Sequence, residues 1–163
     1  MKLKKFFSLL MILFLAASCS KEPTKKSIIN EKSLDLQMIE SYEEGKKALE
    51  RGDVLFAAKK FNEAEILFPQ SPLAPKSALM AAYSYYTQDY YGDAVAELQR
   101  FIKIYPNHKS LDYANYLLAI CYYEQIVDEK KDSQSINNAK KQFLIVLNKY
   151  PDTEFALDSE FKL

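Results

Sequence analysis

The stretch "PQSPLAPKSALMAAYSYY", Pro69 to Tyr86, decides the fold because its pattern returns from Pro106 to Tyr123 as "PNHKSLDYANYLLAICYY". The two stretches align without a gap. Small residues and a closing pair of tyrosines fall at the same places: Ser77 with Ala114, Ala82 with Ala119, and Tyr85-Tyr86 with Tyr122-Tyr123. A match that recurs at this interval indicates a structural repeat.

Aromatic–proline pairs mark three copies of the pattern: Phe68-Pro69, Tyr105-Pro106 and Tyr150-Pro151. The prolines lie 37 and 45 residues apart, and the extra eight residues fall in "VDEKKDSQ" (127–134), which we expect to be a charged loop. Upstream of each proline, an alanine and a large apolar residue recur at fixed distances: Ala57, Ala94 and Ala139, then Phe61, Leu98 and Phe143. The repeat therefore extends to both sides of the prolines.

This pattern resembles the tetratricopeptide repeat (TPR), a helix–turn–helix unit of about 34 residues. In the first unit the family's small, aromatic and proline positions are Gly45, Ala48, Gly52, Ala57, Phe61, Ala64 and Pro69. The resemblance implies an all-α superhelical solenoid, with units at about 38–71, 75–108 and 112–153 and the start of a fourth at 154–163. We expect helices near 34–50, 54–67, 74–88, 91–104, 110–125, 136–149 and from 154 onward.

The last of these helices has an apolar character that a solenoid end normally lacks. Phe155, Phe161 and Leu163 would leave an uncovered apolar face, so we expect the chain to be cut off within a fourth unit.

Composition narrows the class of function. The chain has 163 residues, 3 glycines, no tryptophan and 12 tyrosines, with a net charge of 0. Without the first 18 residues, which hold three lysines and no carboxylate, the charge becomes −3. With this net charge the chain has no excess of basic residues that would form a nucleic-acid-binding surface. We expect no nucleic-acid partner.

The sequence contains few residues that could carry catalysis. His108 is the single histidine, which is too few nitrogen ligands for a zinc site, and we interpret it as a solvated turn residue. No glycine-rich phosphate loop occurs, and Cys121 lies within an apolar helix where it should be a small core residue. We therefore predict a protein that is not an enzyme and holds no metal or cofactor.

The TPR resemblance implies a binding groove, because the first helix of each TPR unit lines the concave face. The residues placed there are Tyr42, Lys46 and Leu49, then Leu79, Tyr83 and Tyr86, then Tyr116, Ile120 and Tyr123. Tyrosines suit peptide recognition because they offer a large apolar ring and a hydroxyl with little loss of side-chain entropy. In the alternative interpretation, Tyr86 and Tyr123 mostly pack within the solenoid. Tyr85 and Tyr122 are expected at inter-helix packing positions.

The N-terminus has the features of an export signal. Three lysines (Lys2, Lys4, Lys5) precede an apolar run, and the run ends in small residues before a polar stretch. "LAASC", residues 15–19, resembles the lipobox of bacterial lipoproteins, in which the cysteine is acylated after cleavage. The resemblance implies a signal peptide at 1–18, a lipid on Cys19, and a flexible tether at 19–33. The alternative is a simple signal peptide. Ser20 after the cysteine points to the inner leaflet of the outer membrane.

The combination of lipobox, tether and repeats resembles the BamD family, TPR lipoproteins of the β-barrel assembly (BAM) machinery. The most specific part is "FIKIYPNHKSLDYANYL", residues 101–117. The resemblance implies a periplasmic scaffold that is lipid-anchored in the outer membrane. Its implied partners are unfolded outer-membrane β-barrel proteins, BamA and other BAM subunits. The alternative is another periplasmic TPR adaptor, in cell division, the Tol pathway or recruitment of peptidoglycan hydrolases.

The N-terminal export signal leads to the first testable prediction. We expect the mature protein to begin at an acylated Cys19, and intact mass spectrometry measures this directly. A Cys19→Ala variant should be released from the membrane or remain unprocessed, because two or more acyl chains are what hold such a protein firmly. Cleavage at another residue, or a mature Cys19 without lipid, would contradict the prediction.

Overall fold

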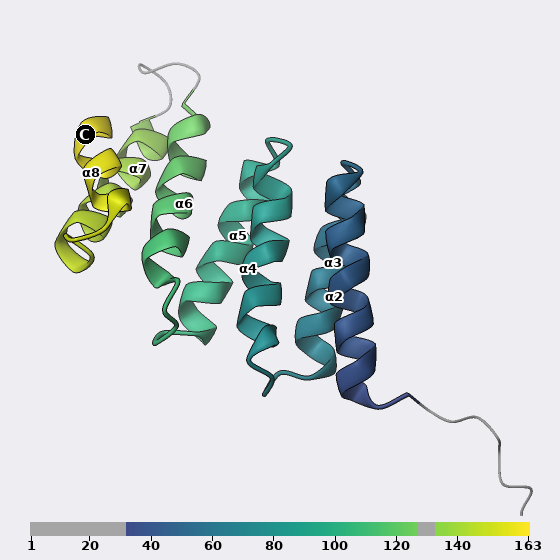
Figure 1. Ribbon diagram of the computed structural model, residues 1–163. Coiled ribbons are helices and arrows are strands. Elements are labelled where there is room, and N and C mark those ends of the chain that lie inside the picture. The colour runs from purple at the N-terminus through teal and green to yellow at the C-terminus, as the bar shows by residue number, and fades with distance from the viewer. Residues whose placement is uncertain (1–31, 127–132) are drawn as a thin grey trace, which may run out of the picture. The chain divides into compact units, whose positions relative to one another are not determined.

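The computed structural model describes residues 32–126 and 133–163, which form seven helices and no strand. The helices are α2 (Leu34–Glu50), α3 (Val54–Leu67), α4 (Leu73–Tyr86), α5 (Tyr91–Ile104), α6 (Leu111–Glu124), α7 (Ser133–Lys149) and α8 (Glu154–Lys162). Each packs against the next along the chain (Figure 1), and α6 also contacts α8. The predicted all-α, TPR-like repeat fold is confirmed. The predicted signal peptide, Cys19 and most of the tether lie outside the described residues.

Most helix boundaries agree with the predictions from sequence. Helices α2, α3 and α5 begin and end at the expected residues, and α8 begins at Glu154. Three helices begin with a polar cap, because Ser33, Asp53 and Thr153 each accept a backbone N–H three residues ahead. The expected loop at 127–134 is partly wrong, since α7 already begins at Ser133; residues 127–132 lie outside the described part.

Small residues set the distance between neighbouring helices. The alanines at the repeat positions have no exposed surface: Ala48, Ala57, Ala64, Ala82, Ala94 and Ala119. A Cβ atom on Gly45 would lie 2.9 Å from the ring of Phe61, so only glycine fits beside this buried aromatic. The predicted pairing of small residues with a filling aromatic is thus confirmed in the first unit.

The core is a chain of three apolar clusters. Phe61 lies in the first, Leu98 and Phe101 in the second, and Phe143 in the third. Tyr85 packs against the first two clusters, and Tyr122 against the second and third, so their predicted inter-helix positions are confirmed. Each unit therefore packs within itself and against its immediate neighbours, as in other repeat proteins.

Cys121 belongs to the second cluster and has no exposed surface, which confirms it as a core residue. Burial raises the pKa of its thiol to about 12, so the group stays protonated and unreactive near neutral pH.

A partly buried ion pair links the first two units, and no pattern in the sequence predicted it. The Arg100 guanidinium donates to both carboxylate oxygens of Glu65 at 2.9 and 2.7 Å, which bridges α5 to α3. The Tyr105 hydroxyl donates to the same carboxylate at 2.7 Å. Arg100 also donates to Glu97 at 2.9 Å. Its hydrogen bond to Glu65, followed by that to Glu97, raises the pKa of the Arg100 guanidinium.

The C-terminal helix α8 leaves part of its apolar surface open. Leu157 and Phe161 are 71% and 89% exposed, and Leu163 is 49% exposed. Phe155 differs from the expectation: its ring stacks on Tyr116 with centroids 5.1 Å apart, so α8 covers part of α6 with this side chain.

Overpacking one helix crossing tests the repeat register. Ala119 is fully buried against Ala139 and Phe143, so Ala119→Leu should cost about 1–3 kcal/mol of unfolding free energy and lower the Tm by several degrees. Thermal denaturation followed by circular dichroism measures this. Ala96→Leu, at an exposed position of α5, is the matched control and should leave the Tm within about a degree. An unchanged Tm for Ala119→Leu would place Ala119 outside the crossing.

Neutralising the buried carboxylate tests the ion pair. Glu65→Gln keeps the side-chain shape but removes the charge that Arg100 faces, and we expect a loss of about 1–3 kcal/mol in chemical denaturation. Glu63→Gln is the control, because the Glu63 carboxylate is 42% exposed, against 8% for Glu65, and its pair with Lys60 should contribute less than about 1 kcal/mol. Equal losses in the two variants would contradict a structural role for the Glu65 pair.

Candidate binding cleft

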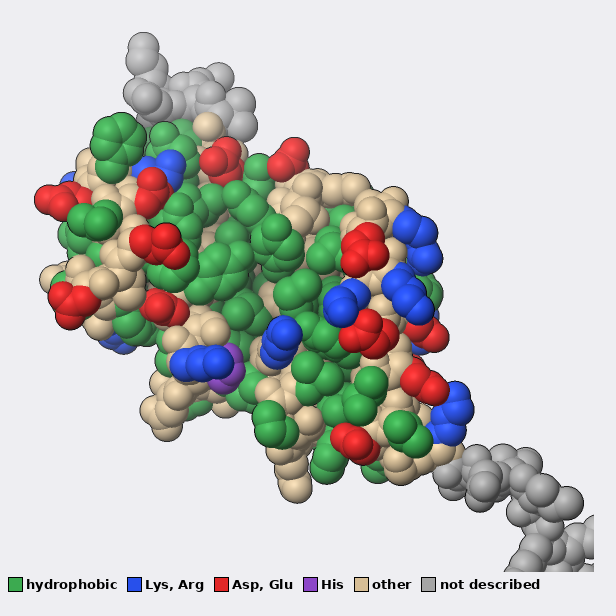
Figure 2. All heavy atoms as spheres, in the orientation of Figure 1, with side chains coloured by type: hydrophobic (Ala, Val, Ile, Leu, Met, Phe, Trp, Pro, Cys, Tyr) green, Lys and Arg blue, Asp and Glu red, His purple; other side chains and the backbone are tan. Residues whose placement is uncertain are grey.

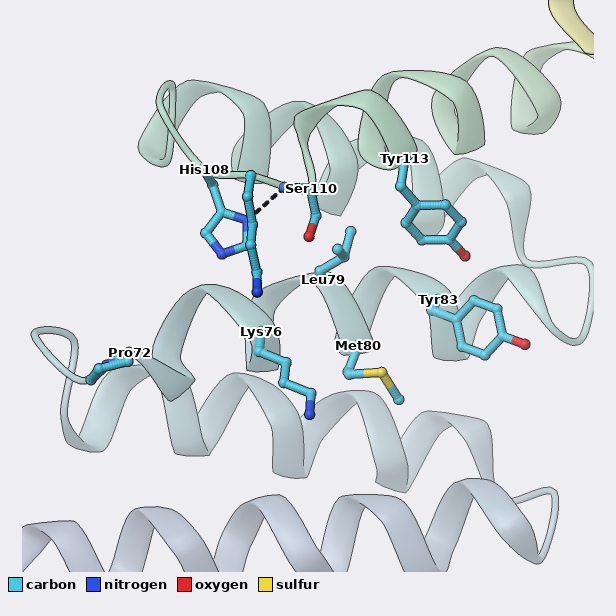
Figure 3. Close-up of a pocket in the computed structure, with 9 residues that line it drawn as sticks. Pro72, Lys76, Leu79, Met80, Tyr83, His108, Ser110 and Tyr113 are labelled. Atoms are coloured by element: carbon cyan, nitrogen blue, oxygen red, sulfur yellow. Dashed lines mark hydrogen bonds between the residues drawn. The ribbon is translucent and has the colours of Figure 1, made fainter. Parts of the chain in front are cut away.

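A cleft with a volume of about 560 Å³ lies between α4 and α6 (Figure 3). One wall is a strip of α4 in which every residue lies on the same helix face: Lys76, Leu79, Met80 and Tyr83. The other wall comes from the turn before α6 and from its first residues: His108, Lys109, Ser110 and Tyr113.

The end of the cleft near the start of α4 is cationic. Lys76 and Lys109 line it, and the Lys76 ammonium lies 5.5 Å from the centre of the Tyr42 ring, a favourable cation–π contact. His108 is not the solvated turn residue that the sequence predicted. Its ring packs edge-on against Phe101 at 5.5 Å, and its Nδ1 accepts a hydrogen bond from the Ser110 backbone N–H at 3.2 Å.

The other end of the cleft is aromatic. Tyr83 and Tyr113 face one another across it (Figure 3), with Leu79 and Met80 between them and the lysines. Burial raises the pKa of Tyr113 to about 12, so its hydroxyl remains protonated and able to donate a hydrogen bond. The cleft thus combines apolar surface, phenol groups and positive charge.

Two smaller hollows continue the cleft along the same face of the solenoid. One, of about 400 Å³, shares Tyr83 and is lined by Leu49 and Val54. The other, of about 280 Å³, shares Tyr113 and reaches Tyr86 and Tyr116. Figure 2 shows hydrophobic side chains gathered over the middle of this face. The three hollows form one groove along α2, α4 and α6, which we call the tyrosine groove.

The structure brings some of the sequence-predicted groove residues to this surface and buries others. Leu79 and Tyr83 line the cleft, and Tyr86 lies half-buried between two core clusters while lining the smaller hollow. Tyr42 and Ile120 are only 7% and 5% exposed, so both side chains belong mainly to the core, and Ile120 also lines the hollow of about 280 Å³.

The remaining predicted residues lie nearer the edges of the groove. Tyr116 is held by α8: its hydroxyl donates to Asp158 at 2.6 Å, and burial together with this bond raises its pKa. Tyr123 is 41% exposed, with its ring edge-on to Phe143 and beneath the Lys162 ammonium. Lys46 forms an exposed ion pair with Glu43.

Sequence reasoning missed most residues of the cleft, among them Lys76, Lys109 and Tyr113. Tyr113 precedes Tyr116 by one helical turn, so the same-face spacing in α6 could have found it. Lys109 belongs to the turn after Pro106, and only the packing of one unit on the next brings it opposite Lys76.

Within residues 32–126 and 133–163 no cluster of histidine, cysteine or carboxylate side chains could hold a metal ion. No helix in that part of the chain is long and apolar enough to cross a membrane.

Comparison with known proteins agrees with this architecture. The YfiO family profile, described as "Outer membrane lipoprotein", matches residues 34–163, which is the whole helical part. The chain belongs to the YfiO/BamD family. A BamD-named relative from Caulobacter vibrioides, "Outer membrane protein assembly factor BamD", is 35% identical over 147 residues, 90% of this chain and 47% of the relative.

Other members of the YfiO/BamD family show the same pattern. A protein of the same name from Rickettsia prowazekii is 30% identical over 164 residues, covering 100% of this chain and 63% of its own length. One from Neisseria gonorrhoeae is 26% identical over 132 residues, with 75% of this chain and 49% of the relative covered. The chain therefore spans about half to two thirds of the relatives that it matches.

Proposed function

We propose that this chain is a subunit of the machinery that assembles β-barrel proteins in the outer membrane, and that it holds segments of their unfolded precursors. The family supports the first part, since the relatives are named outer membrane protein assembly factors. The observation that carries the second part is the tyrosine groove. The main cleft shares Tyr83 with one of the two adjoining hollows and Tyr113 with the other.

The chemistry of the groove fits a barrel strand before it folds. Such a strand alternates apolar and polar residues, and its backbone N–H and C=O groups have no partners yet. Tyrosine rings supply apolar surface to the apolar side chains, while their hydroxyls can bond backbone groups. Binding of this kind is weak, because ordering a flexible segment offsets much of the contact free energy. A carrier of precursors needs such an affinity in order to release them.

The same proposal covers location and partners. A lipid on Cys19 would hold the chain on the periplasmic face of the outer membrane, and the tether would let the solenoid reach a precursor. BamA and other BAM subunits are the proposed partners. The role is that of a scaffold rather than an enzyme, in keeping with a groove that is lined by tyrosines and lysines instead of paired catalytic groups.

Removing one ring from the middle of the groove tests the proposal. In the purified mature protein, Tyr83→Ala should weaken binding of a labelled peptide from a barrel strand about fivefold or more, since a central aromatic contributes at least about 1 kcal/mol. Fluorescence anisotropy gives the Kd. Tyr83 is preferable to Tyr116, because loss of Tyr116 would also release α8 through Asp158.

Tyr90→Ala provides the matched control. Tyr90 is 42% exposed at the start of α5 and lines none of the three hollows, so its loss should leave the peptide Kd unchanged. Both variants should keep the thermal stability of the parent protein. Equal peptide affinity for parent and Tyr83→Ala would rule out the groove as the binding surface, and equal weakening in both variants would do the same.

A further inference from the structure

A separate hollow of about 470 Å³ lies between α5 and α7, with α6 as its floor. Lysines line it from two sides: Lys103 belongs to α5, and Lys141 and Lys149 belong to α7. None of the residues that line this hollow carries a carboxylate. Ammonium groups gathered around one hollow repel each other and favour an anionic ligand between them.

Helix α7 is cationic, although the mature chain is not. It carries Lys140, Lys141 and Lys149 but no aspartate or glutamate, whereas the chain without its first 18 residues has a net charge of −3. Leu144 lies one helical turn after Lys140 and Lys141 and is 41% exposed. Exposed lysines beside an exposed apolar side chain are typical of helices that lie on anionic membranes.

Polar groups at the floor of the hollow suit a phosphate group. Asn115 and Gln142 are only 6% and 9% exposed, and the Gln142 amide donates to the Asn115 side-chain oxygen at 2.7 Å. The Tyr122 hydroxyl accepts a hydrogen bond from the Gln99 amide at 2.8 Å, so its own hydrogen can be donated to a ligand. The hollow therefore offers amide and phenol donors between the lysines, and phosphate oxygens accept from such donors.

The spacing of the charges favours a lipid surface over a single small anion. Lys141 and Lys149 are eight residues apart, roughly 12 Å along α7. A membrane presents many phosphate groups side by side, and it matches this spacing better than one phosphate does.

The hollow and the tyrosine groove lie on opposite sides of α6. Asn115, Leu118 and Tyr122 line the hollow, whereas Tyr113 and Tyr116 line the groove. Each helical residue is turned by about 100° from the one before it, which places these two sets on opposite faces of the helix. A membrane in contact with α7 would therefore leave the groove uncovered.

We propose that the hollow between α5 and α7 binds phosphate groups of anionic phospholipids, with Lys103, Lys141 and Lys149 pairing the phosphates. Leu144 enters the headgroup layer beside them. This inference rests on the location given under the proposed function and adds an orientation to it: the α7 side of the solenoid lies on the membrane, and the tyrosine groove opens away from it.

The test uses the mature chain with Cys19→Ala, because acyl chains would bind any vesicle. Co-sedimentation compares vesicles of phosphatidylcholine alone with vesicles in which phosphatidylglycerol replaces a third of the lipid. We expect binding to be about tenfold tighter with the anionic lipid at low salt, because each lysine near an anionic surface adds to the attraction. The preference should shrink to under about twofold in ~0.5 M salt, which screens exposed charges.

Substitution of the lysines that line the hollow assigns the effect to this surface. The combined variant Lys103→Gln, Lys141→Gln and Lys149→Gln should abolish the preference for anionic vesicles. A matched control removes the same charge at exposed positions outside the hollow and should retain the preference: Lys47→Gln, Lys59→Gln and Lys109→Gln. Circular dichroism checks that both variants fold. Equal loss of the preference in both would overturn the assignment to the hollow.

Two other probes separate the possible sources of the anion. Inorganic phosphate and a polyglutamate peptide are titrated separately, and NMR follows the side-chain amide signals of Asn115 and Gln142. We expect phosphate to bind with a Kd above about 10 mM and polyglutamate to shift the signals no more than salt of equal ionic strength does. Tighter binding of either probe, without a preference for anionic vesicles, would assign the hollow to free phosphate or to an acidic protein segment and overturn the proposal.

Failure of this inference is distinguishable from failure of the proposed function. Equal binding of the Cys19→Ala chain to both kinds of vesicle would overturn the inference and leave the proposed function standing, because acylation of Cys19 and peptide affinity of the tyrosine groove are measured separately. Conversely, a mature Cys19 without lipid would contradict the proposed anchoring, whereas the vesicle preference of the Cys19→Ala chain would still support the lipid site.

Discussion

Close approach of neighbouring helices is the constraint on which the rest of this structure depends. Alanine or glycine occupies the crossing positions, and a single added Cβ at Gly45 would already collide with the ring of Phe61. Because the helices approach this closely, aromatic side chains beside the crossings are either fully enclosed or turned outward. The Phe61 ring is fully enclosed, whereas the Tyr83 ring is turned outward and lines the cleft. The groove therefore forms because the close spacing of the helices turns some aromatic side chains outward.

The fold was largely predictable because its signals are local and repeated. Proline after an aromatic residue ends one unit, and the small residues at the helix crossings identify the next. The errors occurred where the repeat is interrupted: Ser133 belongs to α7 rather than to the inserted loop. The candidate site was less predictable. Leu79 and Tyr83 follow from repeat position alone, whereas Tyr42 and Ile120 are buried by the helices packed on them.

The residues that sequence reasoning missed depend on contacts between units. Lys76 and Lys109 belong to consecutive units, and the Glu65–Arg100 pair joins helices 35 residues apart in the chain. No residue pattern within one unit reports which charges will face one another across the next. The ion pair lies at the boundary between the first and second units and the cleft at the boundary between the second and third, so packing between units governs both.

The Glu65–Arg100 pair also tolerates less sliding of one helix along another than the apolar core does. Apolar side chains can exchange partners when two helices shift along one another, whereas a guanidinium and a carboxylate that share two hydrogen bonds lose both at once. Tyr105 adds a third bond to the same carboxylate. If the solenoid were stretched along its axis, the contact between α3 and α5 would therefore break abruptly. Contacts that are only apolar would instead yield gradually. Within the described residues, the first unit boundary is therefore a stiff joint.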